Sequence, residues 1–180
     1  MQMIDVVQRL LAQQTRIFEI LGFDERPLAR PAATAEQLSL FGQWCRSRGF
    51  SLPPTYREFL LICNGIDNFC LSYGLFGTED LASEAYPVLL RTCLADWIGF
   101  DYGKELPPIL IGYDDETTTR VWFELAHERE TSEEPIVLDG NPGDMSLHVS
   151  FGAFMESRIA TNEATIARLL TLKAKASGDS

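Results

Sequence analysis

The sequence predicts an α+β fold, a mostly antiparallel sheet of about four to six strands with helices packed against it. Two observations carry this prediction. Apolar residues recur at helical spacing over residues 4–65 and again after residue 150. Between these regions lie short runs rich in β-branched and aromatic residues, at 108–113, 119–125 and 135–139. Helices, then strands, then helices are the order typical of an α+β layer fold.

The chain length indicates a single domain, since 180 residues is an ordinary domain size. We expect residues 1–33 to form an N-terminal helix and linker packed on the same domain, residues 34–175 to form the main domain, and residues 176–180 to be a frayed tail. Polar residues interrupt the N-terminal stretch, and no run of about 18 apolar residues occurs. We therefore expect neither a signal peptide nor a membrane span, and a cytoplasmic protein.

Three helices are expected before residue 65, because each has its own start or stop signal. The third helix begins with proline, whose fixed φ suits a first helical turn, and it should bury Phe59 and Leu60. The signals in chain order are Gly22 after residues 4–21, a capping box at Thr34 to Gln37, a stop at Gly49, the start at Pro53-Pro54 and the stop at Asn64-Gly65.

The rest of the chain alternates between extended and helical patterns. We expect an extended stretch at 69–76, a helical region with breaks at 79–98 in which Pro87 starts a new segment, the three strands named above, a turn-rich loop at 139–144 and a last short strand at 147–150. At the end, Ser150 is expected to cap one helix and Thr161 a second.

Charge is the most informative bulk property. The net charge is −11, and residues 61–145 alone carry seventeen acidic and four basic side chains. This sign argues against direct binding to nucleic acid or to an anionic membrane, because both require a basic face. Two explanations of the acidic segment stay open, an interaction surface and general solubility.

No catalytic residue, metal site or cofactor is expected from the motifs. The two histidines, His127 and His148, have no histidine or cysteine at ligand spacing. Nucleophile-elbow and phosphate-binding motifs are absent from the sequence. Carboxylates are so abundant that no pair stands out as hydrolytic. The four cysteines lie in apolar stretches and are interpreted as small core residues: Cys45, Cys63, Cys70 and Cys93.

An ordered series of loose motifs resembles the SUKH superfamily of Smi/Knr-like proteins. The likeness covers about Thr34 to Ile159, and its first motif is the proline-led third helix, Leu52 to Leu60, with its Asn64-Gly65 stop. Its further parts are Gly74-Leu75-Phe76-Gly77 before Glu79-Asp80-Leu81, the strands at 108–113, 119–125 and 135–139, and Ser150-Phe151 with Phe154-Met155. The resemblance implies a SUKH-like α+β fold.

The resemblance also implies a function class, because bacterial SUKH proteins are similar to immunity proteins that neutralise delivered toxins, frequently nucleases. We therefore expect a non-catalytic protein that binds and occludes a cognate toxin, with a basic nuclease as one candidate partner. A regulatory scaffold of the Smi/Knr type is the alternative, and a small carboxylate-based hydrolase is a third. The expected partner-binding residues are Glu79, Asp80, Glu84, Asp114, Asp115 and Glu116, of which the last three should project into solvent from a turn.

Overall fold

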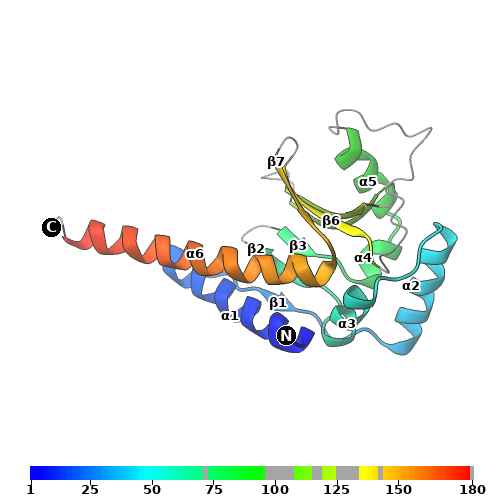
Figure 1. The fold of residues 1–180 in the computed structure, drawn as a ribbon, viewed down its shortest axis with the longest axis horizontal. Coiled ribbons are helices and arrows are strands. Elements are labelled where there is room, and N and C mark those ends of the chain that lie inside the picture. The colour runs from blue at the N-terminus through cyan, green and yellow to red at the C-terminus, as the bar shows by residue number, and fades with distance from the viewer. Residues whose placement is uncertain (71–72, 96–107, 115–118, 125–133, 142–143, 179–180) are drawn as a thin grey trace.

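Seven strands form one antiparallel sheet in the computed structural model, which describes residues 1–70, 73–95, 108–114, 119–124, 134–141 and 144–178. Six helices accompany the sheet in this part of the chain (Figure 1). The α+β class and the antiparallel sheet are confirmed, although the strand count exceeds the four to six expected. Each strand lies beside its neighbour in sequence, in the order β1 to β7.

The helices are α1 (Met3–Leu21), α2 (Ala35–Ser47), α3 (Pro54–Ile62), α4 (Thr78–Ala82), α5 (Tyr86–Ala95) and α6 (Phe151–Gly178). The strands are β1 (Leu28–Ala29), β2 (Ile66–Cys70), β3 (Tyr73–Leu75), β4 (Ile109–Tyr113), β5 (Arg120–Glu124), β6 (Ile136–Asn141) and β7 (Asp144–His148). The three helices expected before residue 65 are therefore present.

Local signals end and begin the first helices as expected. The Gln37 backbone N donates to Thr34 Oγ1 at 3.1 Å, and the Thr34 N donates to Gln37 Oε1 at 2.8 Å, which completes the capping box. Gly65, after α3, has a φ of +102°, a left-handed conformation that favours glycine. A Cβ on Gly65 would also lie 2.8 Å from the Leu75 carbonyl oxygen. Any larger residue there would therefore have both an unfavourable φ and a steric clash.

The C-terminal region differs from the sequence prediction. Ser150 does cap a helix, since its Oγ accepts a hydrogen bond from the Ala153 N at 3.1 Å. Thr161, however, does not start a second helix, because its hydroxyl donates to the Ser157 carbonyl inside a continuous α6. The predicted loop at 139–144 is also mostly strand, with Asp139 to Asn141 in β6 and Asp144 in β7.

The core is aromatic and centred on α3. Tyr56 and Phe59 are fully buried and stack with their ring centroids 5.7 Å apart. Tyr56 also makes edge contacts with Phe151 at 4.9 Å and with Phe123 at 5.2 Å, and its hydroxyl donates to the Phe76 carbonyl. The prediction that Phe59 and Leu60 are buried is confirmed, and α3 thereby joins the sheet to the start of α6.

The cysteines are all free thiols. Cys45, Cys63 and Cys93 are buried, as expected of small core residues, and burial raises the pKa of Cys45 and of Cys63 to about 12. Cys70 on β2 is partly exposed. Three of the four thiols therefore match the sequence interpretation, and the fourth belongs to a polar cluster described below.

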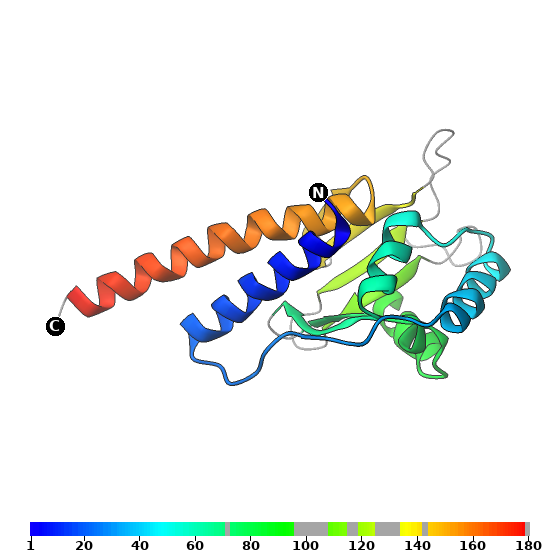
Figure 2. The same ribbon diagram turned by 90° about the horizontal axis from the view of Figure 1, so that it is seen from below.

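Helices α1 and α6 lie side by side and run in the same direction away from the sheet (Figures 1 and 2). The buried Gln14 Nε2 donates to the equally buried Asn162 Oδ1 at 3.0 Å, and Arg9 pairs with Glu163 at the surface of the same contact. Figure 2 shows that α6 continues well past the end of α1. No helix among the described residues combines the length and apolarity that crossing a membrane requires.

The sheet curls around one side chain, Arg158 of α6. Adjacent strands are about 4.8 Å apart, so β2 and β6 would lie about 19 Å apart in a flat sheet. Yet Arg158 Nη2 donates to Cys70 Sγ on β2 at 3.0 Å, and Arg158 Nη1 donates to Asp139 Oδ2 on β6 at 3.3 Å. A single guanidinium group reaches both strands only because the sheet is strongly curved.

Candidate functional site

Two of the predicted binding residues are exposed carboxylates at α4. Glu79 lies in the first turn of α4, and Glu84 follows the helix by two residues. Glu79 Oε1 accepts a hydrogen bond from Gln37 Nε2 at 2.8 Å, which ties α4 to the first turn of α2. The adjacent Glu36 is exposed as well. Glu36, Glu79 and Glu84 are called the α2–α4 acidic surface below.

Asp80, by contrast, is held in a structural network. Its Oδ2 accepts hydrogen bonds from Arg30 Nη1 at 2.6 Å and from the Gly77 backbone N at 2.7 Å, so it caps α4. Arg30 also donates to Asp67 on β2, with Nη2 at 2.5 Å and Nε at 3.1 Å from Oδ1. The pKa of Arg30 is raised above its usual value, mainly by the hydrogen bond to Asp67 and further by the negative charge of the nearby Asp80. One guanidinium therefore pairs with two carboxylates and joins β2 to α4.

Asp114 does not project into solvent, so that prediction is wrong. Asp114 is only 3% exposed, and it directly follows Tyr113, the last residue of β4. The Asp114 backbone N donates to the Thr119 carbonyl at 3.1 Å, which extends the pairing of β4 with β5. The neighbouring Asp115 and Glu116 lie outside the described residues.

Other acidic residues of the 61–145 segment also serve the fold. Glu134 Oε1 accepts from the Thr55 backbone N at 2.6 Å, and Glu134 Oε2 accepts from Thr55 Oγ1 at 2.7 Å, so it caps α3 from outside. Asp139 pairs with Arg158. Five carboxylates of this segment are thus buried or bound to arginine, backbone or hydroxyl groups of the chain: Asp67, Asp80, Asp114, Glu134 and Asp139.

A polar cluster that the sequence analysis missed surrounds Arg158. This Arg158 cluster consists of Cys70, Tyr73, Asp139, His148 and Arg158. Burial raises the pKa of Asp139, although Arg158 and His148 oppose the shift, and burial lowers the pKa of His148. The pKa of Arg158 is raised because Tyr73, Cys70 and Asp139 together outweigh the opposite effect of burial.

The cluster contains residue types used in catalysis, but its geometry is that of a clamp. The guanidinium holds a thiol and a carboxylate from two distant strands at 3.0 and 3.3 Å. The Tyr73 hydroxyl is buried and has no hydrogen-bond partner among the described residues. Period-two alternation was the signal that could have located Asp139, because it places Asp139 on the same face of β6 as the buried Val137.

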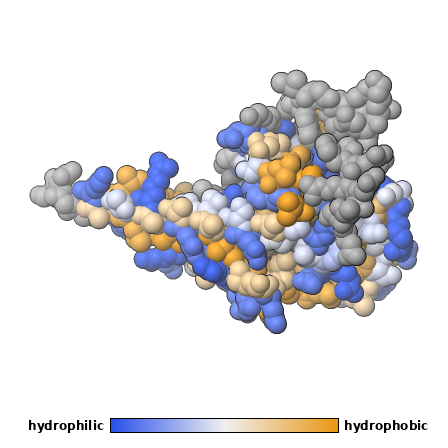
Figure 3. Space-filling view, in the orientation of Figure 1, coloured by the Kyte–Doolittle hydropathy of each residue, from blue (hydrophilic) through white to orange (hydrophobic). Residues whose placement is uncertain are grey.

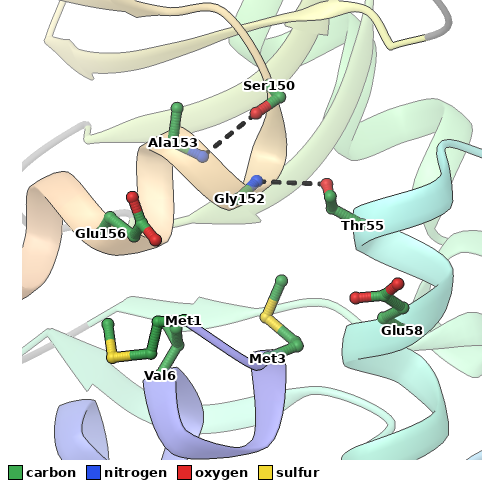
Figure 4. A pocket seen from close by; sticks show the side chains of 9 residues that line it. All are labelled: Met1, Met3, Val6, Thr55, Glu58, Ser150, Gly152, Ala153 and Glu156. Carbon is green, nitrogen blue, oxygen red and sulfur yellow. Dashed lines mark hydrogen bonds between the residues drawn. The ribbon is translucent and has the colours of Figure 1, made fainter.

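A pocket of about 310 Å³ lies where the first turns of α1, α3 and α6 converge (Figure 4). Thr55 Oγ1 accepts a hydrogen bond from the Gly152 backbone N at 3.1 Å at one wall. The carboxylates of Glu58 and Glu156 stand on different walls, and both residues are exposed. The lining residues are Met1, Met3, Val6, Thr55, Glu58, Ser150, Gly152, Ala153 and Glu156.

A scan against protein-family models and a search of curated proteins found no match for the chain. Within the described residues, no group of three or more histidine, cysteine or acidic side chains is placed to hold a metal ion. The arrangement offers an exposed acidic surface at α2 and α4, an open pocket with two carboxylates, and a buried clamp. Of these, the acidic surface is the one that contains residues predicted from the sequence.

Proposed function

We propose that the chain is a non-catalytic immunity protein that binds a cognate bacterial toxin in the cytoplasm and occludes it. The observation that carries the proposal is the distribution of charge. Residues 61–145 have a net charge of −13, whereas α1 and α6 together carry six basic and four acidic side chains. The ordered resemblance to the SUKH superfamily supports the immunity role, and the exposed α2–α4 acidic surface supplies carboxylates that a partner can reach.

A basic nuclease is the partner class that this charge fits. A nuclease must carry a basic face to hold its phosphate-rich substrate, and an acidic surface competes for that face. Opposite charges on two proteins speed their diffusional encounter and align them before contact. Occlusion then requires only that the bound immunity protein covers the substrate groove, so no reaction on the toxin is needed.

Co-expression with the protein encoded next to this chain tests the proposal. The immunity role requires that the pair copurifies and that the chain restores growth of cells expressing the neighbouring protein. A neighbouring protein that neither binds nor poisons cells would reject the immunity role. A bound partner without toxicity would instead favour the regulatory scaffold.

Charge reversal then tests the surface. We expect Glu79→Lys with Glu84→Lys to slow toxin association about tenfold and to reduce its dependence on salt. The matched control is Asp24→Lys with Glu25→Lys, the same change of net charge on exposed residues that follow α1 at the other end of the molecule (Figures 1 and 2). Equal slowing by both pairs would show that overall charge, and not the α2–α4 acidic surface, governs association.

A further inference from the structure

The two edges of the sheet are protected very differently. At one edge, β1 has only two residues, and Pro27 and Pro31 flank it closely. Short edge strands and prolines are the usual means by which proteins prevent edge-to-edge pairing. At the other edge, β7 has five residues, with neither proline nor lysine among them, and Pro142 precedes it by two residues. Among the described residues no strand and no backbone hydrogen bond pairs with the outer side of β7, so its backbone groups are a template for another strand.

Side chains on β7 and just after it are also unusually apolar for a sheet edge. Leu147 and Val149 are each 59% exposed. Met145 and Leu147 are two positions apart on β7 and so share one face of the sheet, and Val149 follows one residue after the strand. Figure 3 shows a hydrophobic patch over the region of β6 and β7. From Asp144 to Val149 the only acidic or basic side chain besides His148 is Asp144 itself.

We propose that β7 pairs antiparallel with β7 of a second copy of this chain, so that two sheets join across a twofold axis. The sequence of β7 is complementary to itself when the axis passes through Ser146. Met145 then faces Leu147 of the second copy, and Asp144 faces His148 of the second copy, each pair occurring twice. Apolar side chains meet apolar ones, a pairing that stabilises antiparallel strands, and the acid meets an imidazole that can donate a hydrogen bond to it.

Charge favours this register and this partner. Moving the axis towards Asp144 brings the two Asp144 carboxylates together, and like charges on opposing strands are destabilising. The chain as a whole carries −11, so two copies repel each other at most surfaces. The β7 edge, with only Asp144 and His148 as acidic or basic side chains, adds little to that repulsion, and salt should strengthen the dimer by screening the rest of the molecule. This salt response is opposite to the one expected for binding to a basic toxin.

Sedimentation of the full chain at increasing concentration and at two salt concentrations tests the proposal. The expected result is a species of twice 20.2 kDa that forms more readily at high salt. Leu147→Lys should give a monomer, because it places lysine at the edge and removes the contact with Met145. The matched control is Leu28→Lys on β1, where the replaced leucine is 62% exposed, and it should still dimerise.

A cysteine at the axis tests the register. The two Ser146 Cα atoms would lie about 4.5–5.5 Å apart, which is within the range for a disulfide. Ser146→Cys should therefore form a covalent dimer under mild oxidation, whereas the unsubstituted chain under the same conditions should not. A wild-type chain that stays monomeric, or a Leu147→Lys variant that dimerises like the wild type, would overturn the proposal. A dimer that Ser146→Cys fails to cross-link would overturn the register.

Discussion

Replacing Arg158 by methionine should expose how much the clamp contributes to the fold. The substitution keeps an unbranched side chain in α6 but removes both hydrogen bonds, to Asp139 and to Cys70. Asp139 is then left in a site where its side chain is only 7% exposed. Breaking a buried pair by removing one partner costs about 3–5 kcal/mol, because an uncompensated charge remains. The free energy of unfolding should fall by about that amount at pH 7.

The orphaned carboxyl group can avoid its charge by binding a proton, which sets an upper limit on this penalty. For a carboxyl group with the ordinary pKa of 3.8, binding a proton costs about 4 kcal/mol at pH 7 and only about 1.6 kcal/mol at pH 5. The deficit of Arg158→Met should therefore shrink from about 3–4 kcal/mol at pH 7 to below about 2 kcal/mol at pH 5. Urea denaturation followed by tryptophan fluorescence measures both values.

Two further variants make the result decisive. Arg168→Met makes the same substitution at an exposed position of the same helix and should cost less than about 0.5 kcal/mol. Combining Arg158→Met with Asp139→Leu removes both charges and should recover much of the lost stability. A deficit that is equal at the two pH values, or a double variant as unstable as Arg158→Met alone, would refute the reasoning.

Three other stability predictions follow from buried groups. Phe59→Ala should cost about 3–5 kcal/mol in urea denaturation, whereas Leu61→Ala on the exposed side of α3 should cost far less. Burial lowers the pKa of His148, so its neutral form stabilises the fold above the unfolded-state pKa of about 6.5, and this stability is lost as pH falls through the lower folded-state value. His148→Gln should flatten that part of the pH profile. Gln14→Leu should leave the Asn162 amide unpaired and cost about 1–3 kcal/mol, with Gln14→Leu plus Asn162→Leu less damaging than the single change.

The helices could be predicted because their signals are local. A capping box, a proline at the first turn and a left-handed glycine each act within a few residues, and Thr34, Pro54 and Gly65 behave as their residue types require. The prediction that Thr161 caps a second helix was wrong because a threonine hydroxyl can either cap a helix or donate to a carbonyl within one, and the sequence does not decide between the two. The strand β1 was missed because two residues carry no periodic pattern, and only pairing with β2 makes them a strand.

The candidate site was harder to predict because contacts between distant segments decide which carboxylates remain exposed for a partner. Asp80 is separated from Arg30 by fifty residues, and Asp139 from Arg158 by nineteen, so neither pairing is visible as a local motif. Asp114 looked like a turn residue beside two other acids, yet it lies at the end of a buried strand. Glu79 and Glu84 kept the expected exposure because one lies in the first turn of the short helix α4 and the other just after it.

Strand β2 connects the two arginine networks, and this separates the charges of the fold from those available to a partner. Its Asp67 binds Arg30, which continues to Asp80 at α4, and its Cys70 binds Arg158, which continues to β6. Glu79 and Glu84 belong to neither network. Reversing them should therefore change association and, beyond the exposed hydrogen bond from Gln37 to Glu79, have little effect on stability, whereas removing Arg158 should change stability first. A variant series in which binding and stability fall together for Glu79 and Glu84 would contradict that separation.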